Sequence, residues 1–309
     1  MTASVRPSGP APATPPAGAP DTGSPDAGVA AAPGYDRRRT LPLRVEVIRQ
    51  LRRRRTIVAF LILLLLPWIL VAAFKLGGPP QPGGAPPELV DLATDGGLNF
   101  AGFSFFAAAG FLLVVAVAMF CGDTIASEAN WASLRYLLAA PVPRTRLLRQ
   151  KMIVALGYSA VALVIFPAMS LLAGTVVFGW HPLRLPATEI ELPYGTALAR
   201  TGITLAYVMI TLLVVAGLAF LLSVSTDSPL GAVGGAVGLI IVGNILNQVT
   251  ALGSWREILP SYWQFAWLDA YSAQLSWGAM IEGAAVSVSY ALVLFALAFR
   301  HFRRKDIVS

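Results

Sequence analysis

The sequence predicts an all-α polytopic membrane protein with six transmembrane helices, an N-terminal interfacial amphipathic helix, and short external interfacial or re-entrant helices before the last span. Of the 309 residues, 56% are hydrophobic and 13% are charged, whereas about 25% are charged in an ordinary soluble domain. Uncharged apolar stretches of 17 or more residues recur, and a bilayer span needs roughly 20. The low share of charged residues and the long apolar stretches exclude a soluble enzyme. A nucleic-acid-binding domain is excluded as well, because the charges of this +7 chain sit at the ends of spans.

The first 55 residues divide into a tail and a basic segment. Residues 1–36 are rich in Pro, Ala and Gly, so we expect a disordered tail. Nine arginines follow within residues 37–55. At helical spacing Leu43, Val47 and Leu51 share an apolar arc. The opposite side of the helix holds Glu46, Arg49, Gln50 and Arg53. This pattern is typical of a basic amphipathic helix on an anionic cytoplasmic membrane surface, and it also serves as a topology anchor.

Residues 56–309 form the predicted six-span domain. The predicted spans are residues 57–74, 100–121, a tilted span within 152–180, 201–225, 229–249 and 283–299. Pro67 in the first span predicts a kink, because proline removes a helix hydrogen bond and crowds the preceding turn.

The orientation follows from the placement of lysine and arginine. With the N-terminus inside, 19 of the 23 basic residues lie in cytoplasmic segments and four lie outside. Short basic segments stay on the cytoplasmic side of a membrane. We therefore expect both termini to be cytoplasmic and the chain to reside in a plasma (inner) membrane. The excess of 20 arginines over 3 lysines suggests a GC-rich bacterial genome.

Two external connections have different character. Residues 75–99 are rich in Pro and Gly and predict an irregular loop. Residues 250–282 hold four tryptophans and two tyrosines but few charges. Trp and Tyr favour the headgroup level of a bilayer, so short interfacial or re-entrant helices fit this stretch. A seventh span is the alternative, but it would place the arginine-rich C-terminus outside.

The cytoplasmic segment 122–151 predicts a short helix across the inner face. Asp123 or Thr124 could cap that helix, and Pro141 and Pro143 must end it. A second, basic helix then leads into the third span. Such an element can be pushed by a cytosolic partner and is joined to two spans.

Polar residues within the spans are few. Asn244, Asn247 and Gln248 share one face of the fifth span. They would either line a translocation path or make interhelical hydrogen bonds, each worth roughly 0.6–2 kcal/mol. Because no acidic or basic residue sits clearly at mid-membrane, ion-driven secondary transport is disfavoured. The sequence also lacks a catalytic set and a Cys/His cluster with metal spacing.

The segment 128–151 resembles the membrane permease subunit of type-2 ABC transporters, mostly exporters. The resemblance rests on Glu128, Ser133-Leu134-Arg135, the run 138–144 (Leu-Ala-Ala-Pro-Val-Pro-Arg), Leu147-Leu148 and Lys151. The basic helix, the six spans and the external elements also match. Ala132-Ser133 stands where the family usually shows Gly-Thr, and the tail has no counterpart there.

This resemblance implies a transmembrane permease subunit that works by alternating access and exports a lipophilic or amphipathic substrate. The helix around 128–140 would be a coupling helix docked on a separate ABC ATPase subunit, with Glu128 and Arg135 in polar contact with it. The candidate ATPase-coupling residues are Asp123, Glu128, Ser133, Leu134, Arg135, Leu138, Pro141, Pro143, Arg144 and Lys151. A second permease protomer, identical or not, would complete the transporter within the membrane lipid.

The sequence predicts that this chain is not itself an enzyme and binds no cofactor. A P-loop needs Gly-Lys-Ser/Thr, and none of the three lysines follows a glycine. ATP and Mg would therefore be held by the partner subunit. Two other readings stay open: a non-transporting membrane scaffold or receptor that recruits a cytosolic partner through 122–151, and a passive channel.

Overall fold

The computed structural model describes residues 43–77, 87–130, 144–185 and 190–304. Within these ranges it is all-α apart from one two-stranded hairpin, and six helices are long and apolar enough to cross a membrane. The predicted fold class is therefore confirmed. The tail 1–36 and the candidate residues Ser133, Leu134, Arg135, Leu138, Pro141 and Pro143 lie outside the described ranges.

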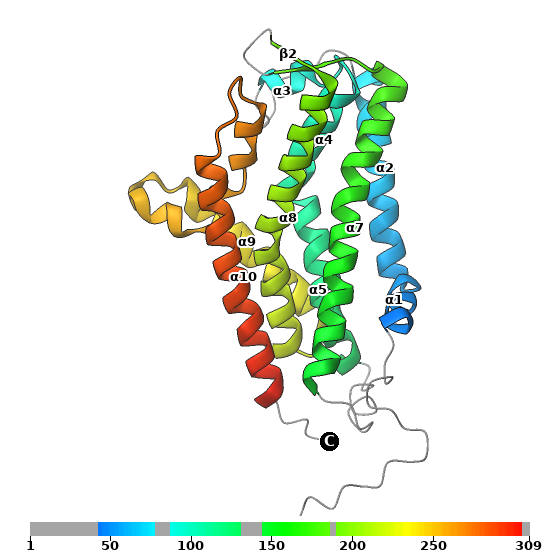
Figure 1. Ribbon diagram of the computed structural model, residues 1–309. Coiled ribbons are helices and arrows are strands. Elements are labelled where there is room, and N and C mark those ends of the chain that lie inside the picture. Colours follow the sequence, from blue (N-terminus) through cyan, green and yellow to red (C-terminus); the bar gives the residue numbers. More distant parts are fainter. Residues whose placement is uncertain (1–42, 78–86, 131–143, 186–189, 305–309) are drawn as a thin grey trace, which may run out of the picture. The chain divides into compact units, whose positions relative to one another are not determined.

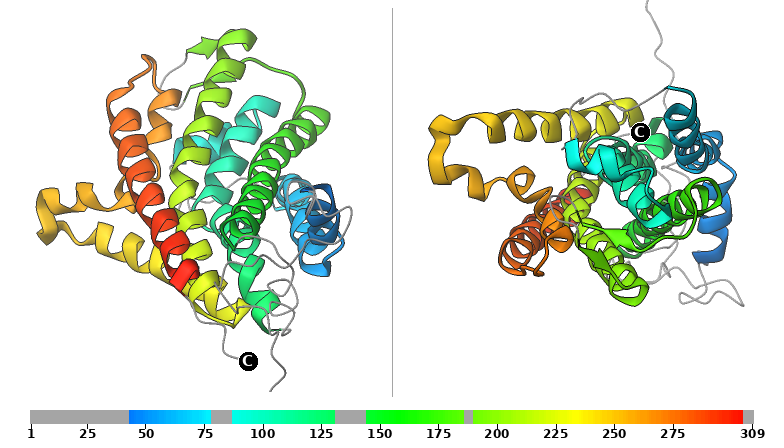
Figure 2. Two further views of the ribbon diagram at one scale, coloured as in Figure 1. Left: turned by 60° about the horizontal axis from the view of Figure 1, so that its bottom comes forward. Right: turned by 90° about the horizontal axis from the view of Figure 1, so that it is seen from above.

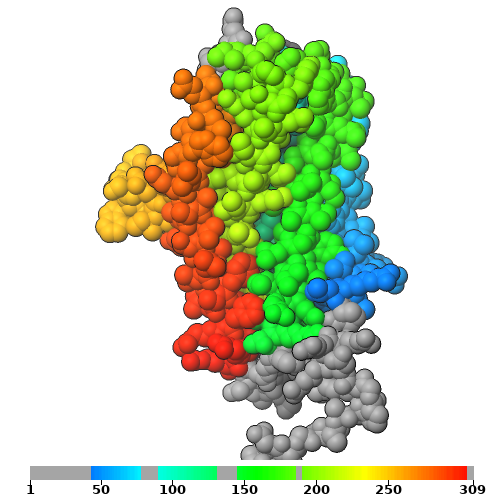
Figure 3. All heavy atoms as spheres, in the orientation of Figure 1, coloured from blue at the N-terminus to red at the C-terminus, as the bar shows by residue number. Residues whose placement is uncertain are grey.

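The N-terminal elements are a short helix and a long apolar one. The predicted basic helix 37–55 ends earlier than expected, because α1 spans Leu43–Leu51 and α2 (Arg54–Leu76), the first candidate span, already begins at Arg54. The α2 helix continues through Pro67. Figures 1 and 3 show α1 beside the lower part of α7, where the Tyr158 hydroxyl donates a hydrogen bond to the Val47 carbonyl at 2.7 Å.

The second predicted span is two helices instead of one. Helix α3 (Pro87–Leu92) precedes α4 (Gly97–Ala109), and α5 (Leu112–Asn130) follows after a break at Gly110 and Phe111. Glycine lowers helix stability by about 1 kcal/mol relative to alanine, which favours the break there. Helix α5 is central: 78% of its apolar window is buried, against 17% for α2.

Helix α5 also runs nine residues past the predicted end of the span at Cys121. The prediction that Asp123 or Thr124 caps a new helix is therefore wrong. Thr124 and Ser127 instead donate their hydroxyl hydrogens to the carbonyls four residues earlier, at 2.7 and 2.6 Å. Arg53 and Arg55 compensate the charge of Asp123, so the helix continues through this polar stretch.

The third and fourth candidate spans are long. Helix α7 (Arg144–Phe178) begins eight residues before the predicted span, and α8 is Tyr194–Ser225. Between them, strands β1 (Leu183–Arg184) and β2 (Glu191–Leu192) pair antiparallel. Asn99 at the start of α4 donates to the Arg184 carbonyl at 2.8 Å and accepts from its backbone N–H at 3.1 Å. We call this side of the helices the hairpin end.

The last part of the chain, from residue 229 on, projects away from the other helices and then packs against them again. Helix α9 (Pro229–Gln248) is followed by the short 3₁₀ helices η1 (Thr250–Ile258), η2 (Pro260–Trp263) and η3 (Ala266–Tyr271), and then by α10 (Gly278–Arg304). Figures 2 and 3 show the end of α9 and η1 standing out beside α10. The predicted short helices are thus present, and this stretch is not a seventh span.

The return of the chain is anchored by aromatic and backbone contacts. Trp267 in η3 is 1% exposed and packs edge-on against Phe105 of α4. The Tyr207 hydroxyl donates to the Trp263 carbonyl at 2.6 Å. Helix α10 passes so close that a Cβ on Gly283 would lie 2.2 Å from the Tyr207 hydroxyl oxygen. Glycine at 283 is what permits this approach.

Candidate coupling site

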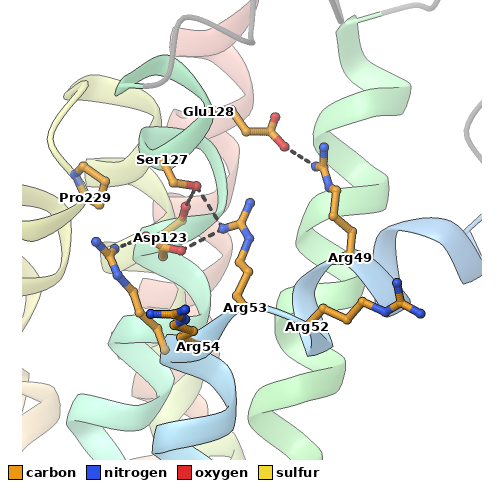
Figure 4. Close-up of a pocket in the computed structure, with 9 residues that line it drawn as sticks. Arg49, Arg52, Arg53, Arg54, Asp123, Ser127, Glu128 and Pro229 are labelled. Atoms are coloured by element: carbon orange, nitrogen blue, oxygen red, sulfur yellow. Dashed lines mark hydrogen bonds and ion pairs between the residues drawn. The ribbon is translucent and has the colours of Figure 1, made fainter.

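Four segments from three distant parts of the sequence meet opposite the hairpin end. They are α1, the first turn of α2, the end of α5 and the start of α7 (Figures 1 and 4). The acidic and basic side chains that they bring together form what we call the charged cluster. Its members are Glu46, Arg49, Arg53, Arg55, Asp123, Glu128 and Lys151. We call this side of the helices the cluster end.

The centre of the charged cluster is a buried ion pair between α5 and α7. The Lys151 ammonium lies 2.5 Å from a Glu128 carboxylate oxygen, and the two side chains are 1% and 4% exposed. Breaking one partner of such a pair costs about 3–5 kcal/mol, because the other charge is left buried without compensation. The pair therefore fixes the end of α5 against the start of α7.

Helix α1 closes the cluster from the side. Arg49 contacts the Glu128 carboxylate, as Figure 4 shows, and Lys151 also reaches Glu46 at 3.1 Å. Gln50 is the buried residue of α1 and donates to Glu46 at 3.0 Å. The polar face of α1 thus faces α5 and α7, whereas its apolar residues Val45 and Leu51 are exposed.

These contacts change the acidity of the side chains on α1. Burial alone would raise the pKa of the Glu46 carboxyl, but Lys151, Gln50 and Arg49 outweigh it and hold the pKa below its ordinary value. Burial likewise would lower the pKa of the Arg49 guanidinium, and the carboxylates of Glu128 and Glu46 raise it instead. Glu46 is therefore ionised at neutral pH, and so is Arg49.

A second ion-pair group joins α2 to α5 one turn earlier on α5. Arg53 lies 2.7 Å from Asp123 and donates to the Ser127 hydroxyl at 2.9 Å, and Arg55 lies 2.6 Å from the other Asp123 oxygen. Figure 4 shows Arg53 between Asp123 and Ser127. The two groups together connect the interfacial helix, the first span and the central helix at one end.

Three predicted site residues, Asp123, Glu128 and Lys151, come together in this cluster. The resemblance implied that Glu128 touches a partner, but its side chain is 4% exposed and ion-paired within the chain. Its effect on a partner would therefore be indirect. Arg144 begins α7, and the remaining predicted coupling residues lie in 131–143, outside the described ranges.

Sequence reasoning missed the partners of these residues. Glu46, Arg49 and Arg53 were assigned to the solvated face of an interfacial helix, and the role of Ser127 was not seen. The one local signal was the i, i+3 spacing of Glu46 and Arg49, which form an ion pair at 2.7 Å. No local pattern connects Arg49 to Glu128, which lies 79 residues later.

The polar residues of the fifth predicted span lie elsewhere. Asn244, Asn247 and Gln248 are in the last two turns of α9, next to η1, where Arg256 donates to the Asn247 carbonyl at 3.3 Å. The Asn247 side-chain oxygen is buried without a hydrogen-bond partner among the described residues. These residues are not part of the charged cluster.

The fold and this cluster define a multi-pass helical membrane protein. The chain belongs to the family described as "Protein of unknown function (DUF2705)", whose sequence model matches residues 89–308. It is also 26% identical over 200 residues to the "Uncharacterized protein YhcI" of Bacillus subtilis (strain 168). That match spans 60% of this chain and 61% of the relative. The family match includes α5 and α7 but begins after α1 and α2.

Proposed function

We propose that the chain is the transmembrane permease subunit of an ATP-driven transporter of the type-2 ABC class. The observation that carries the proposal is the charged cluster, because it sits at the two helix ends that flank residues 131–143, the middle of the predicted coupling segment 122–151. Glu128 is two residues before the end of α5, and Lys151 is seven residues after the start of α7. A force applied to 131–143 therefore reaches a rigidly paired set of helix ends.

The geometry supports transmission of motion rather than chemistry. Helix α5 is the most buried candidate span and packs against α7, α8 and α9. Displacing its cluster end would repack these helices as a unit, since packed interiors switch between discrete arrangements instead of deforming continuously. A partner that binds one arrangement better would shift the population toward it.

The partner in this proposal is a separate ATPase that holds ATP and Mg and contacts the segment 131–143. The cluster end is cytoplasmic in this arrangement, as the positive-inside rule predicts. The apolar surfaces of the candidate spans suit a lipophilic or amphipathic substrate, exported through a cavity between two permease protomers.

The test begins with the neighbouring open reading frames, one of which we expect to encode a P-loop protein, and continues with reconstitution of that protein with this chain. The pair is co-purified and inserted into liposomes, and ATP hydrolysis is compared between wild type, Arg135→Ala in the predicted coupling segment, and Arg184→Ala at the hairpin end. We expect a stable complex and stimulated hydrolysis for wild type and Arg184→Ala, with both reduced for Arg135→Ala. Lack of a wild-type complex would contradict the proposal, and a complex without any effect on hydrolysis would indicate a scaffold.

A further inference from the structure

A cavity of about 540 Å³ opens beside the charged cluster. Five arginines from α1, α2 and the bend between them line it, and Pro229 at the start of α9 stands on its far side (Figure 4). The carboxylates in its lining are Asp123 and Glu128. Among the lining residues that the structure describes, five positive charges stand against two negative ones, an excess of three positive charges.

The arginines of the cavity fall into two groups. Arg49, Arg53 and Arg55 form the ion pairs described above. Arg52 and Arg54 also line the cavity, are exposed, and make no ion pair with any residue that the structure describes. Their guanidinium groups keep all their donors for a ligand, and a guanidinium binds phosphate through paired N–H donors.

Helix ends add to this positive potential. The 23-residue helix α2 begins at Arg54, and its N-cap residue Arg53 makes no side-chain cap. The first N–H groups of a helix lack intrahelical acceptors and carry the positive end of its dipole. Helix α9 also begins at the cavity, but Pro229 has no N–H and the Ser228 hydroxyl accepts from the Gly231 N–H at 3.1 Å, so this helix adds its dipole and not free donors. A cavity with free arginines and helix N-termini is suited to an anion with several acceptor oxygens.

The surroundings favour an anion attached to a lipid. The surface of α2 next to the cavity is apolar: Ile57, Val58 and Leu61 are 53%, 52% and 51% exposed. An acyl chain could lie along this surface while its headgroup occupies the cavity. Basic pockets at the ends of transmembrane helices bind anionic headgroups in this way.

We propose that this cavity is a phosphate-binding site that takes the headgroup of an anionic phospholipid, held by Arg52 and Arg54. Its occupant would join the α1–α2 bend to the start of α9, two segments whose described side chains face each other across the cavity. This inference needs only a membrane and does not depend on the proposed transport function.

The experiment uses the purified full-length chain and two matched double variants. Arg52→Gln with Arg54→Gln removes the free charges of the cavity. Arg303→Gln with Arg304→Gln removes two charges from the last turn of α10, which also lies at the cluster end but does not line the cavity. Because Arg52 and Arg54 make no ion pairs, the first variant should fold, and its melting temperature without lipid checks this.

Binding is measured by native mass spectrometry during titration with phosphatidylglycerol, with phosphatidylcholine as the neutral reference. A second arm titrates inorganic phosphate against chloride at equal ionic strength. We expect the cavity variant to bind phosphatidylglycerol at least about tenfold more weakly, since each charged hydrogen bond contributes about 1.5–3 kcal/mol. The α10 variant should change binding by less than about twofold.

The two arms identify the source of the phosphate group. Loss confined to the lipid arm assigns the site to a lipid headgroup, and the same loss with inorganic phosphate assigns it to free phosphate. Equal weakening in both double variants would mean that a diffuse surface charge binds the lipid, and this would overturn the proposal. Undiminished binding in the cavity variant would overturn it as well.

Discussion

The two ends of the helices differ in how deeply their ion pairs are buried. At the hairpin end, Arg184 pairs with Asp95 at 2.8 Å and with Glu191 at 3.5 Å, and these side chains are 30–52% exposed. At the cluster end, ion pairs between side chains join α1, α2, α5 and α7. Toward the hairpin end, the returning chain is held by hydrogen bonds to backbone carbonyls and by aromatic packing. Arg200, for example, donates to the carbonyls of Ala270 and Ser272 at 3.1 and 2.6 Å, although it too is buried.

This difference has a physical consequence for movement. A backbone carbonyl is fixed by the fold, so contacts directed at it specify one arrangement of the chain. Ion-paired side chains can exchange partners, and the Glu128 carboxylate already contacts both Arg49 and Lys151. We therefore expect the cluster end to be displaced more easily than the hairpin end.

The largest effect should come from breaking the buried pair. Lys151→Met leaves Glu128 buried with less compensation, and we expect it to destabilise the protein by about 3–5 kcal/mol. The double variant Lys151→Met with Glu128→Gln removes both charges and should recover most of that loss. Unfolding titrations in mixed micelles measure both values. A single variant as stable as the wild type would show that the pair does not hold α5 to α7.

A smaller loss should follow from filling the close contact of α10 with the returning chain. A Cβ on Gly283 would lie 2.2 Å from the Tyr207 hydroxyl oxygen and 2.6 Å from the Trp263 Cβ. Gly283→Ala should therefore cost about 1–3 kcal/mol of folding stability, as overpacking generally does. Gly234→Ala in α9 is the control, since nothing lies within 4 Å of its Cβ position. Equal melting temperatures for both variants would contradict the close packing.

Removing one neutral hydrogen bond should have a modest effect. Tyr207→Phe deletes the donor to the Trp263 carbonyl and should cost about 0.6–1.5 kcal/mol. Tyr290→Phe, at a position 38% exposed on α10, is the matched control and should change stability little. The same unfolding titration measures both variants. A loss of stability in Tyr290→Phe as large as in Tyr207→Phe would show that the Tyr207–Trp263 hydrogen bond does not stabilise the protein.

The smallest effect concerns pH. Because the pKa of Glu46 is lower in the folded chain than its unfolded value of about 4.3, its ionised form contributes stability above that pH. The contribution is lost as pH falls through the folded-state pKa. The melting-temperature difference between wild type and Glu46→Gln should therefore shrink from pH 7 to pH 4. Glu282→Gln, at an exposed position on α10, is the control, and an equally large decrease in that variant would contradict the assignment to Glu46.

The spans were predictable because length and hydropathy determine them locally. Five of the six predicted spans correspond to single helices, and the predicted span 100–121 is divided between α4 and α5. The break at Gly110 and the extension of α5 to Asn130 were not predicted. The first depends on the low helix propensity of Gly110 together with a distant contact, since Gln264 donates to the Ala109 carbonyl at 3.5 Å. The second depends on arginines about 70 residues away that neutralise Asp123.

The candidate site was predictable only in part for the same reason. Asp123, Glu128 and Lys151 were identified as polar residues beside a connecting segment, but their partners on α1 and α2 were not. The amphipathic pattern of α1 correctly separated its two faces. It could not indicate that the polar face meets buried charges while the apolar face is exposed, because both environments lie at a membrane surface.

In the function that we propose, the charged cluster couples a partner ATPase to the helices. The most direct test of this coupling is ATP hydrolysis in liposomes by the reconstituted complex with Lys151→Met and Glu128→Gln combined. This chain should remain folded and should still bind the ATPase, because the segment 131–143 is unchanged. We expect the complex with the double variant to show no stimulated hydrolysis. Stimulation equal to that of the wild-type complex would contradict a coupling role for the cluster.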